Sequence, residues 1–260
     1  MQDGTYQCMG ATMRYKRGGK PGGKTILYLR SEESLPADKS FVEALARDFD
    51  VVVPDHPGFG QSDNPDWLRG MGDTAYFYLD YLSGLGLTDI HIVGASMGGW
   101  IGAEIAVRDT SRIASLSLIA PYGVREKGQI YGDVFLWTPE QNIRHRFVDQ
   151  TFAEQFLGVE HTSRETTELL KDRYATARLG WAPRFHNPEL QRWLHRINRP
   201  TLLVWGDSDR IAPPAMAKAW QAGLPSSQLV TINACGHLPH MERMNDTHAA
   251  VTKFIGELRA

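Results

Sequence analysis

The sequence predicts an α/β fold, with a mostly parallel central sheet and helices on both of its faces. Short apolar runs rich in β-branched residues alternate with longer helical patterns near both ends of the chain, as is typical of a parallel sheet that is buried on both sides. The length of 260 residues, 42% of them hydrophobic, suffices for a large domain that needs no disulfide or metal to hold its core.

Each element follows from its local pattern. The first part of the chain is expected to form a hairpin (residues 5–16), a strand (25–29), a helix (37–48), a strand (51–53) and a helix (74–85). Next come a strand (90–93), a helix (97–108) and a strand (113–119). The alternation returns near the end with a strand (201–205), a helix (213–222), a strand (228–232) and a helix (245–258).

The pattern changes between residues 121 and 199. This stretch is helical, with scattered Trp, Phe, Arg and His residues, and it lacks clear buried strands. We expect residues 1–120 and 200–260 to form the core and residues 121–199 to form a helical cap over the carboxyl edge of the sheet. The alternative is that residues 121–199 add further helices around the core.

Composition excludes several classes of partner. The net charge of −2 gives no indication of nucleic acid or an anionic membrane, and no apolar run approaches the ~20 residues that span a bilayer. The N-terminus lacks the apolar segment of a signal peptide, and Cys8 and Cys235 lie far apart, which favours reduced thiols in a cytoplasmic protein. We expect a small-molecule substrate and neither a metal nor a cofactor; a homo-oligomer remains open.

A glycine-rich turn around Ser96 carries the first functional signal. Residues 94–99 read Gly-Ala-Ser-Met-Gly-Gly and directly follow the apolar run 90–93. This order fits the G-x-S-x-G turn, in which a serine adopts strained dihedrals between a strand and a helix. We expect the turn to expose the Ser96 hydroxyl beside the backbone N–H of Met97. The alternative is a serine that only caps the helix.

A nucleophilic serine needs a histidine base, and the base needs a carboxylate that orients it. Both residue types follow later predicted strands. Residues 206–210 read Gly-Asp-Ser-Asp-Arg, and a Gly-His pair stands at 236–237. Because the carboxyl ends of parallel strands converge on one crevice, we expect His237 and either Asp207 or Asp209 to meet Ser96 there.

Taken together, these segments resemble the α/β-hydrolase superfamily along nearly the whole chain. The matching segments are residues 55–63, 94–99 and 205–213, and Gly236-His237 with Glu242. The resemblance implies Ser96 as nucleophile, Asp209 as acid and His237 as base. It also implies that Asp207 shapes its turn and that Glu242 ties loops together near the site.

The chain departs from this family after the predicted strand 25–29. Relatives carry a His-Gly pair there, and the residue after the pair donates the second oxyanion N–H; here Arg30-Ser31 stands in its place. We expect a backbone N–H of Ser31 or Glu32 to complete an oxyanion hole with that of Met97. A carboxylate near a developing oxyanion opposes it, so Glu32 would weaken this hole unless its side chain turns away or pairs with Arg30.

The expected reaction is hydrolysis of a small apolar or aromatic carboxylic ester through an acyl-enzyme. One alternative is carbon–carbon bond hydrolysis of aromatic ring-fission products by a similar family. Leu238 favours the ester, because those hydrolases often carry tryptophan after the Gly-His pair. Another alternative is a ligand-binding protein with little or no catalysis, because the His-Gly pair is missing.

Within residues 121–199, three side chains are expected to contact the substrate: Trp137, Trp181 and His186. Basic residues of the same stretch, among them Arg144 and Arg146, could meet a substrate carboxylate, but solvated positions are favoured for them.

Overall fold

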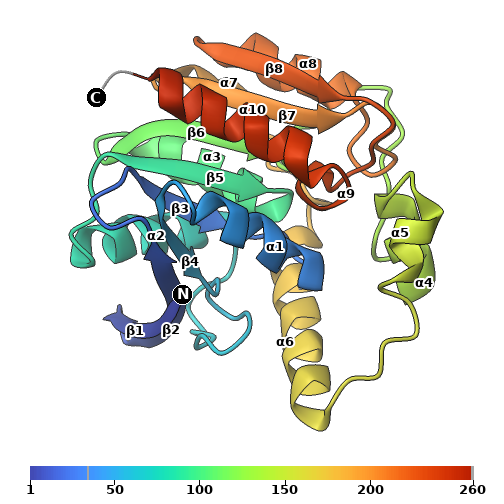
Figure 1. Ribbon diagram of the computed structural model, residues 1–260, viewed down its shortest axis with the longest axis horizontal. Helices are drawn as coiled ribbons and strands as arrows, with labels where there is room; N and C mark the ends of the chain where they lie inside the picture. Colours follow the sequence, from blue (N-terminus) through green and yellow to red (C-terminus); the bar gives the residue numbers. More distant parts are fainter. Residues whose placement is uncertain (34, 259–260) are drawn as a thin grey trace.

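The computed structural model describes residues 1–33 and 35–258. Ser34, Arg259 and Ala260, which fall within the expected core ranges, lie outside the described residues. The strands are β1 (Gln2–Cys8), β2 (Ala11–Gly19), β3 (Thr25–Leu29), β4 (Asp50–Pro54), β5 (Ile90–Ala95), β6 (Ile113–Ile119), β7 (Thr201–Gly206) and β8 (Ser227–Ile232). They form one sheet in the order β1-β2-β4-β3-β5-β6-β7-β8 (Figure 1). β1 and β2 are antiparallel, as are β2 and β4, and the remaining neighbours are parallel.

Helices cover both faces of the sheet (Figure 1). They are α1 (Pro36–Leu45), α2 (Met71–Gly84), α3 (Met97–Arg108), α8 (Ala215–Gly223), α9 (Pro239–Glu242) and α10 (Met244–Glu257). The alternation along β3 shows how the faces arise: Ile26 packs in a cluster with residues of α1 and α10, and Leu27 packs in a cluster with residues of α2, α3 and α8. Because successive strand side chains point to opposite faces, a strand buried on both sides is apolar throughout.

The strand order places a functional crevice at the ends of β3 and β5. The chain leaves β3 toward β4 and leaves β5 toward β6, so the two connections run in opposite directions from neighbouring strands. Such a switch point is where ligands bind in open α/β sheets. The register pairs Leu29 with Gly94, so the residues that follow these two, Arg30 to Glu33 and Ala95 to Ser96, start side by side.

The expected fold class is confirmed, and several elements match the sequence pattern closely. β3, β6 and α3 have the predicted bounds, the hairpin and β4 extend beyond theirs, and α2 begins three residues and ends one residue before its predicted bounds. The short helix α9, directly after His237, was not predicted, because four residues show no helical period.

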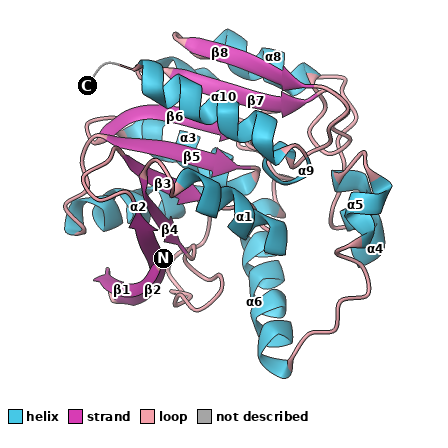
Figure 2. Cartoon of the chain, in the orientation of Figure 1, coloured by secondary structure: helices cyan, strands magenta, loops and turns pink. Residues whose placement is uncertain are grey.

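Residues 121–199, called here the helical segment, contain α4 (Pro139–Arg146), α5 (Gln150–Glu154), α6 (Ser163–Gly180), α7 (Leu190–Trp193) and the 3₁₀ turn η1 (Leu194–Arg196). The first residues of α4 and α6 are fixed by the local sequence. Thr138 with Gln141, and Thr162 with Glu165, form capping boxes in which each partner satisfies a backbone N–H of the other. Figure 2 shows α6 and the pair α4–α5 as two separate arms, joined by the long connection 155–162.

Two further findings bear on the expectations from composition. In the part of the chain that the structure describes, none of the helices combines the length and apolar character needed to cross a bilayer. Cys8 and Cys235 are both buried and free.

Gly98 is the glycine on which the position of the site depends most. A Cβ at Gly98 would lie 2.0 Å from the carbonyl oxygen of Leu29 and 2.4 Å from that of Arg30. Backbone oxygens cannot rotate away, so α3 approaches the end of β3 only without a side chain here. We expect Gly98→Ala to lower the free energy of unfolding by about 1–3 kcal/mol or more, measured by urea denaturation.

The matched control is Gly256→Ala in α10, where a Cβ meets no described atom within 4 Å. This substitution is expected to raise the free energy of unfolding by up to about 1 kcal/mol, because alanine favours a helix over glycine. Equal effects of the two substitutions would show that the close approach at Gly98 is unimportant.

Candidate active site

Ser96 sits on a strained turn between β5 and α3. Its φ of 51° and ψ of −113° fall where side chains are rarely tolerated, which costs about 1–3 kcal/mol. The surrounding structure holds the strain: the Ser96 N–H donates to Ile119 O at 2.9 Å, and its carbonyl accepts from Trp100 N and Tyr122 N. A Cβ at Gly94 would lie 2.6 Å from Gly98 O, so the first glycine of the motif lets the helix start against the strand.

A chain of two hydrogen bonds runs from Ser96 to Asp209. Ser96 Oγ lies 2.8 Å from His237 Nε2, and His237 Nδ1 lies 2.8 Å from Asp209 Oδ2. An ionised carboxylate only accepts, so Nδ1 carries the proton and Nε2 accepts from the serine hydroxyl. The other oxygen, Asp209 Oδ1, accepts the N–H groups of Ile211 and Ala212 at 2.8 and 2.9 Å, which fixes the carboxylate. Ser96, His237 and Asp209 thus have the geometry of a nucleophile, a base and an orienting acid.

The neighbouring acids have other roles. Asp207 is exposed and accepts from Ser208 Oγ at 2.8 Å and from Cys235 N at 3.4 Å, so it shapes its turn. Glu242 ties two loops together. Its Oε1 accepts from Val148 N and Asp149 N, and its Oε2 accepts from Gly236 N beside the histidine.

The oxyanion side of Ser96 differs from the expectation. The Glu32 side chain turns toward the nucleophile, and its Oε2 accepts the Met97 N–H at 3.5 Å, the long end for such a bond. Its charge partner is Arg146, whose Nη2 lies 2.9 Å from Glu32 Oε1 and 2.9 Å from Glu33 Oε1. Neither condition for a harmless Glu32 is met, because the side chain does not turn away and Arg30 pairs with Asp55 and Asp172 instead.

Glu32 is a buried but ionised carboxylate. Burial alone raises the pKa of Glu32, but Arg146, His237 and hydrogen bonds, one of them with Ser96, outweigh it, so the pKa lies below its ordinary value. Tyr122 OH donates to Glu32 Oε1 at 3.2 Å. Burial, and then the charge of Glu32, raise the pKa of Tyr122 well above its usual range, so its hydroxyl keeps its proton.

Ser96 is fully buried, which corrects the expected exposure of its hydroxyl. Two side chains lie against it, His237 by its hydrogen bond and Glu32 on the Met97 side. The ring of Tyr122 packs on His237, with the ring centroids 5.2 Å apart. The turn does present the hydroxyl at the carboxyl end of the sheet, but the Glu32 side chain fills the space beside it.

The loop after β3 is anchored by a buried histidine. His56 Nε2 lies 3.0 Å from Arg30 O, and His56 Nδ1 lies 2.6 Å from Tyr78 OH. A carbonyl oxygen only accepts, so Nε2 carries the proton and the ring is neutral. Ser31, also buried, donates its hydroxyl to Glu33 O at 3.1 Å. The contacts of His56 and Ser31 hold the loop that presents Glu32.

This anchor predicts sensitivity to acid. Burial lowers the pKa of His56 from 6.5 to about 4. Because the folded value lies below the unfolded one, the stabilisation is complete above about pH 6.5 and is lost as the pH falls toward 4, by about 3 kcal/mol in total. The difference in unfolding free energy between wild type and His56→Gln is therefore expected to shrink over this interval, as measured by urea denaturation.

Exposed His195 offers the control, since His195→Gln is expected to change the unfolding free energy by less than about 0.5 kcal/mol at either pH. A His56→Gln difference that is constant with pH would show that His56 does not titrate with unfolding.

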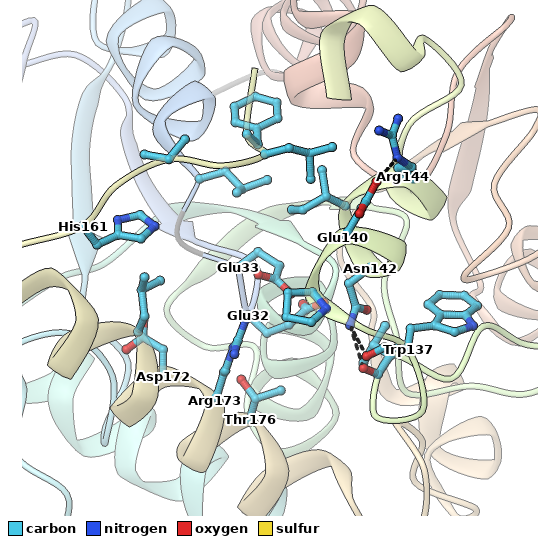
Figure 3. Close-up of a pocket in the computed structure, with 18 of the residues that line it drawn as sticks. Glu32, Glu33, Trp137, Glu140, Asn142, Arg144, His161, Asp172, Arg173 and Thr176 are labelled. Carbon is cyan, nitrogen blue, oxygen red and sulfur yellow. Dashed lines mark hydrogen bonds and ion pairs between the residues drawn. The ribbon is translucent and has the colours of Figure 1, made fainter. Parts of the chain in front are cut away.

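A cavity of about 1010 Å³ lies between α6 on one side and α4–α5 on the other. Figure 3 shows Glu32 and Glu33 between Asp172 and Thr176 of α6 and Asn142 of α4. Many lining side chains are apolar, among them Phe135, Trp137, Ile143, Phe156, Leu157 and Leu169. Charged side chains also line the cavity, among them Glu140, Arg144, Asp172 and Arg173. The size is typical of a site for a small molecule.

Of the three predicted substrate contacts, Trp137 is part of the described cavity lining, and Trp181 and His186 are not. Trp137 lines the cavity and stacks on His145 with ring centroids 4.2 Å apart. Trp181 is instead 54% exposed and packs under the Arg184 guanidinium, because it caps the end of α6 on the outer side. His186 bonds Arg184 O through Nδ1 at 3.0 Å and pairs with Gly123 as an isolated bridge. Trp181 and His186 are therefore placed apart from the described lining of the cavity.

Two residues of this site were not predicted. Arg146 was expected in solvent but is fully buried at the last position of α4. Tyr122 follows β6 by three positions, and the only sequence signal for it is a place after a strand at the carboxyl edge. Within the described residues, no group of three or more His, Cys, Asp or Glu side chains is arranged to hold a metal ion.

Comparison with known proteins agrees with this fold. A family model described as alpha/beta hydrolase fold matches residues 32–243, which is more than half of the chain. The chain therefore belongs to the α/β-hydrolase family.

Its relatives within that family are enzymes of more than one kind. The chain is 22% identical to Lipase 1 of Psychrobacter immobilis, over 92% of this chain and 78% of the lipase. It is 26% identical to the 2-hydroxy-6-oxo-6-phenylhexa-2,4-dienoate hydrolase of Burkholderia cepacia, over 81% of this chain and 78% of that enzyme. Among solved structures, a serine hydrolase from Cycloclasticus zankles has a TM-score of 0.79 at 20% identity, covering 100% of this chain and 99% of that one. That likeness shows the same fold.

Proposed function

We propose that this protein is a serine hydrolase that cleaves small apolar or aromatic carboxylic esters through an acyl-enzyme. The observation that carries the proposal is the pair of 2.8 Å hydrogen bonds that joins Ser96, His237 and Asp209. This arrangement activates a hydroxyl that is otherwise a poor nucleophile at neutral pH.

In the proposed reaction, Ser96 Oγ attacks the ester carbonyl carbon while His237 Nε2 takes the hydroxyl proton. The carbonyl electron pair moves onto its oxygen, which the Met97 N–H binds, together with a backbone N–H of Ser31 or Glu32. His237 then gives its proton to the alcohol oxygen as the carbon–oxygen bond breaks. Water attacks the acyl-enzyme in the same way and releases the acid. Asp209 holds the imidazole and balances its charge throughout.

The substrate class is inferred from the cavity between α6 and α4–α5, in which the helical segment serves as a cap. The apolar part of its lining favours an acyl or aromatic group, although charged side chains such as Glu140, Asp172 and Arg173 line the cavity as well.

A second candidate is hydrolysis of carbon–carbon bonds in aromatic ring-fission products. It is favoured by the 26% identity to a hydrolase of such a dienoate. The proposed order of preference rests on Leu238, which stands after His237 where the carbon–carbon hydrolases often carry tryptophan.

The test is covalent labelling with a fluorophosphonate, which assumes no substrate. An activated Ser96 Oγ forms a bond to phosphorus as fluoride leaves, and mass spectrometry of the digested protein locates the adduct. Labelling of Ser96 with turnover of p-nitrophenyl acetate or butyrate supports the ester hydrolase, whereas loss of absorbance of a ring-fission dienoate supports the second candidate. Absence of both labelling and turnover, in the wild type and in a variant with a smaller side chain at Glu32, contradicts both candidate functions.

A further inference from the structure

Glu32 stands between the cavity and the nucleophile. It lines the cavity (Figure 3), whereas Ser96 is fully buried and lies outside the described lining. Its Oε2 accepts the Met97 N–H, which is the donor that an oxyanion would use. A substrate that enters from the cavity therefore meets the Glu32 carboxylate before it meets Ser96.

We propose that the Glu32 carboxylate occupies the oxyanion hole of the resting protein and that an acyl substrate must displace it to react. This inference rests on the proposed hydrolase function. A carboxylate that touches both the Met97 N–H and the Ser96 hydroxyl takes the place of the acid product of ester hydrolysis. Glu32 therefore acts as an internal competitor for the carbonyl oxygen of the substrate and selects substrates that can displace it.

The contacts of Glu32 allow such a displacement. The bond to Met97 N is long at 3.5 Å, whereas the ion pair with Arg146 is short at 2.9 Å, so the weaker contact faces the nucleophile. Within the described residues, Nε and Nη1 of Arg146 make no hydrogen bond. A carboxylate that leaves Met97 can thus stay paired with Arg146 and gain a second N–H donor from it.

Electrostatics makes the displacement necessary rather than optional. An ionised Glu32 that stayed beside the Met97 N–H would repel the oxyanion of the tetrahedral intermediate in a buried site, where charges interact strongly. Burial of Arg146 opposes its charge, but Glu33 and Glu32 outweigh this and hold the pKa of Arg146 above its ordinary value, so a cation remains beside the displaced carboxylate.

The test compares Glu32→Ala with Glu189→Ala. Glu189 pairs with Arg192 and lies outside the described lining of the cavity, so its substitution serves as the control for loss of a paired glutamate. We measure the second-order rate of Ser96 labelling by a fluorophosphonate and kcat/KM for p-nitrophenyl butyrate. An oxyanion donor contributes about 10²–10³ in turnover, so freeing it is expected to raise both rates about 10- to 100-fold in Glu32→Ala. Glu189→Ala is expected to stay within about twofold of wild type.

Glu32→Gln keeps the size of the side chain and removes its charge, and its expected rates lie between those of wild type and Glu32→Ala. It decides the matter if Glu32→Ala fails to fold: a faster rate than wild type supports the proposal, and an equal or slower rate overturns it. Equal labelling of wild type and Glu32→Ala overturns the inference but leaves the hydrolase function intact. Slower reaction of Glu32→Ala also overturns it. Failure of every variant to label at Ser96 contradicts the hydrolase function itself.

Discussion

Ser96→Ala is expected to abolish turnover while leaving the fold intact. Removing the nucleophile of a serine–histidine–acid chain lowers kcat by a factor on the order of 10⁶, because the remaining groups act only as a unit. The backbone contacts of residue 96 with Ile119, Trp100 and Tyr122 involve no side-chain atom and persist in the variant. Turnover of p-nitrophenyl butyrate and labelling by a fluorophosphonate measure the loss, and circular dichroism measures the fold.

Ser117→Ala is the matched control. Ser117 is a buried serine on β6, the strand beside β5, and its hydroxyl has no hydrogen-bond partner among the described residues. Its substitution is expected to leave turnover unchanged. Residual turnover in Ser96→Ala at more than a thousandth of the wild-type rate would mean that another group attacks the substrate.

Arg146→Met is expected to have the largest effect on stability. The substitution leaves the buried Glu32 carboxylate without its charge partner, which costs about 3–5 kcal/mol. The hydrogen bond from His237 N to Arg146 O is made by backbone atoms and is retained. The midpoint of thermal unfolding is expected to fall by about 10 °C, as followed by circular dichroism.

Two variants separate charge from packing. Arg144→Met removes a half-buried arginine of the same helix that pairs with the exposed Glu140, and it is expected to cost less than about 1 kcal/mol. The double variant Glu32→Gln/Arg146→Met removes both charges and is expected to recover most of the lost stability. If the double variant is as unstable as Arg146→Met, the loss comes from packing around the arginine stem.

The fold was predictable from sequence because its signals are local. The bounds of α3 follow from the glycine turn before it and the apolar face within it, and β6 follows from a run of apolar residues that only two serines interrupt. The chain order of Ser96, Asp209 and His237 after three strands was also readable, because the sheet brings strand ends together whatever lies between them.

The Glu32 side of the site was not predictable for the opposite reason. Whether Glu32 turns toward Ser96 depends on Arg146, which lies 114 positions further along the chain. Arg146 belongs to α4, and the sequence pattern does not reveal which face of this helix is buried. Its neighbours Arg144 and His145 are only half-buried. Residues of the same helical turn therefore differ in their surroundings: Arg146 is buried in an ion pair, whereas its neighbours are partly in solvent. The sequence showed that the His-Gly pair was missing, but only the folded chain shows what fills its place.

The bonds of Glu242 restrict how the entrance to Ser96 can widen. Glu242 joins the chain just after α4, at Val148 and Asp149, to the loop of His237, and His237 N is bound directly to Arg146 O at 2.8 Å. An outward movement of α4 would therefore pull the His237 imidazole away from the Ser96 hydroxyl, to which it must stay hydrogen-bonded. The opposite wall, α6, is anchored to a different part of the core, because Asp172 accepts from Gly60 N at 2.7 Å and Lys171 Nζ donates to Gly60 O at 3.0 Å. An outward shift of α6 (Figure 1) would break these bonds but would leave the hydrogen bonds of the His237 loop in place.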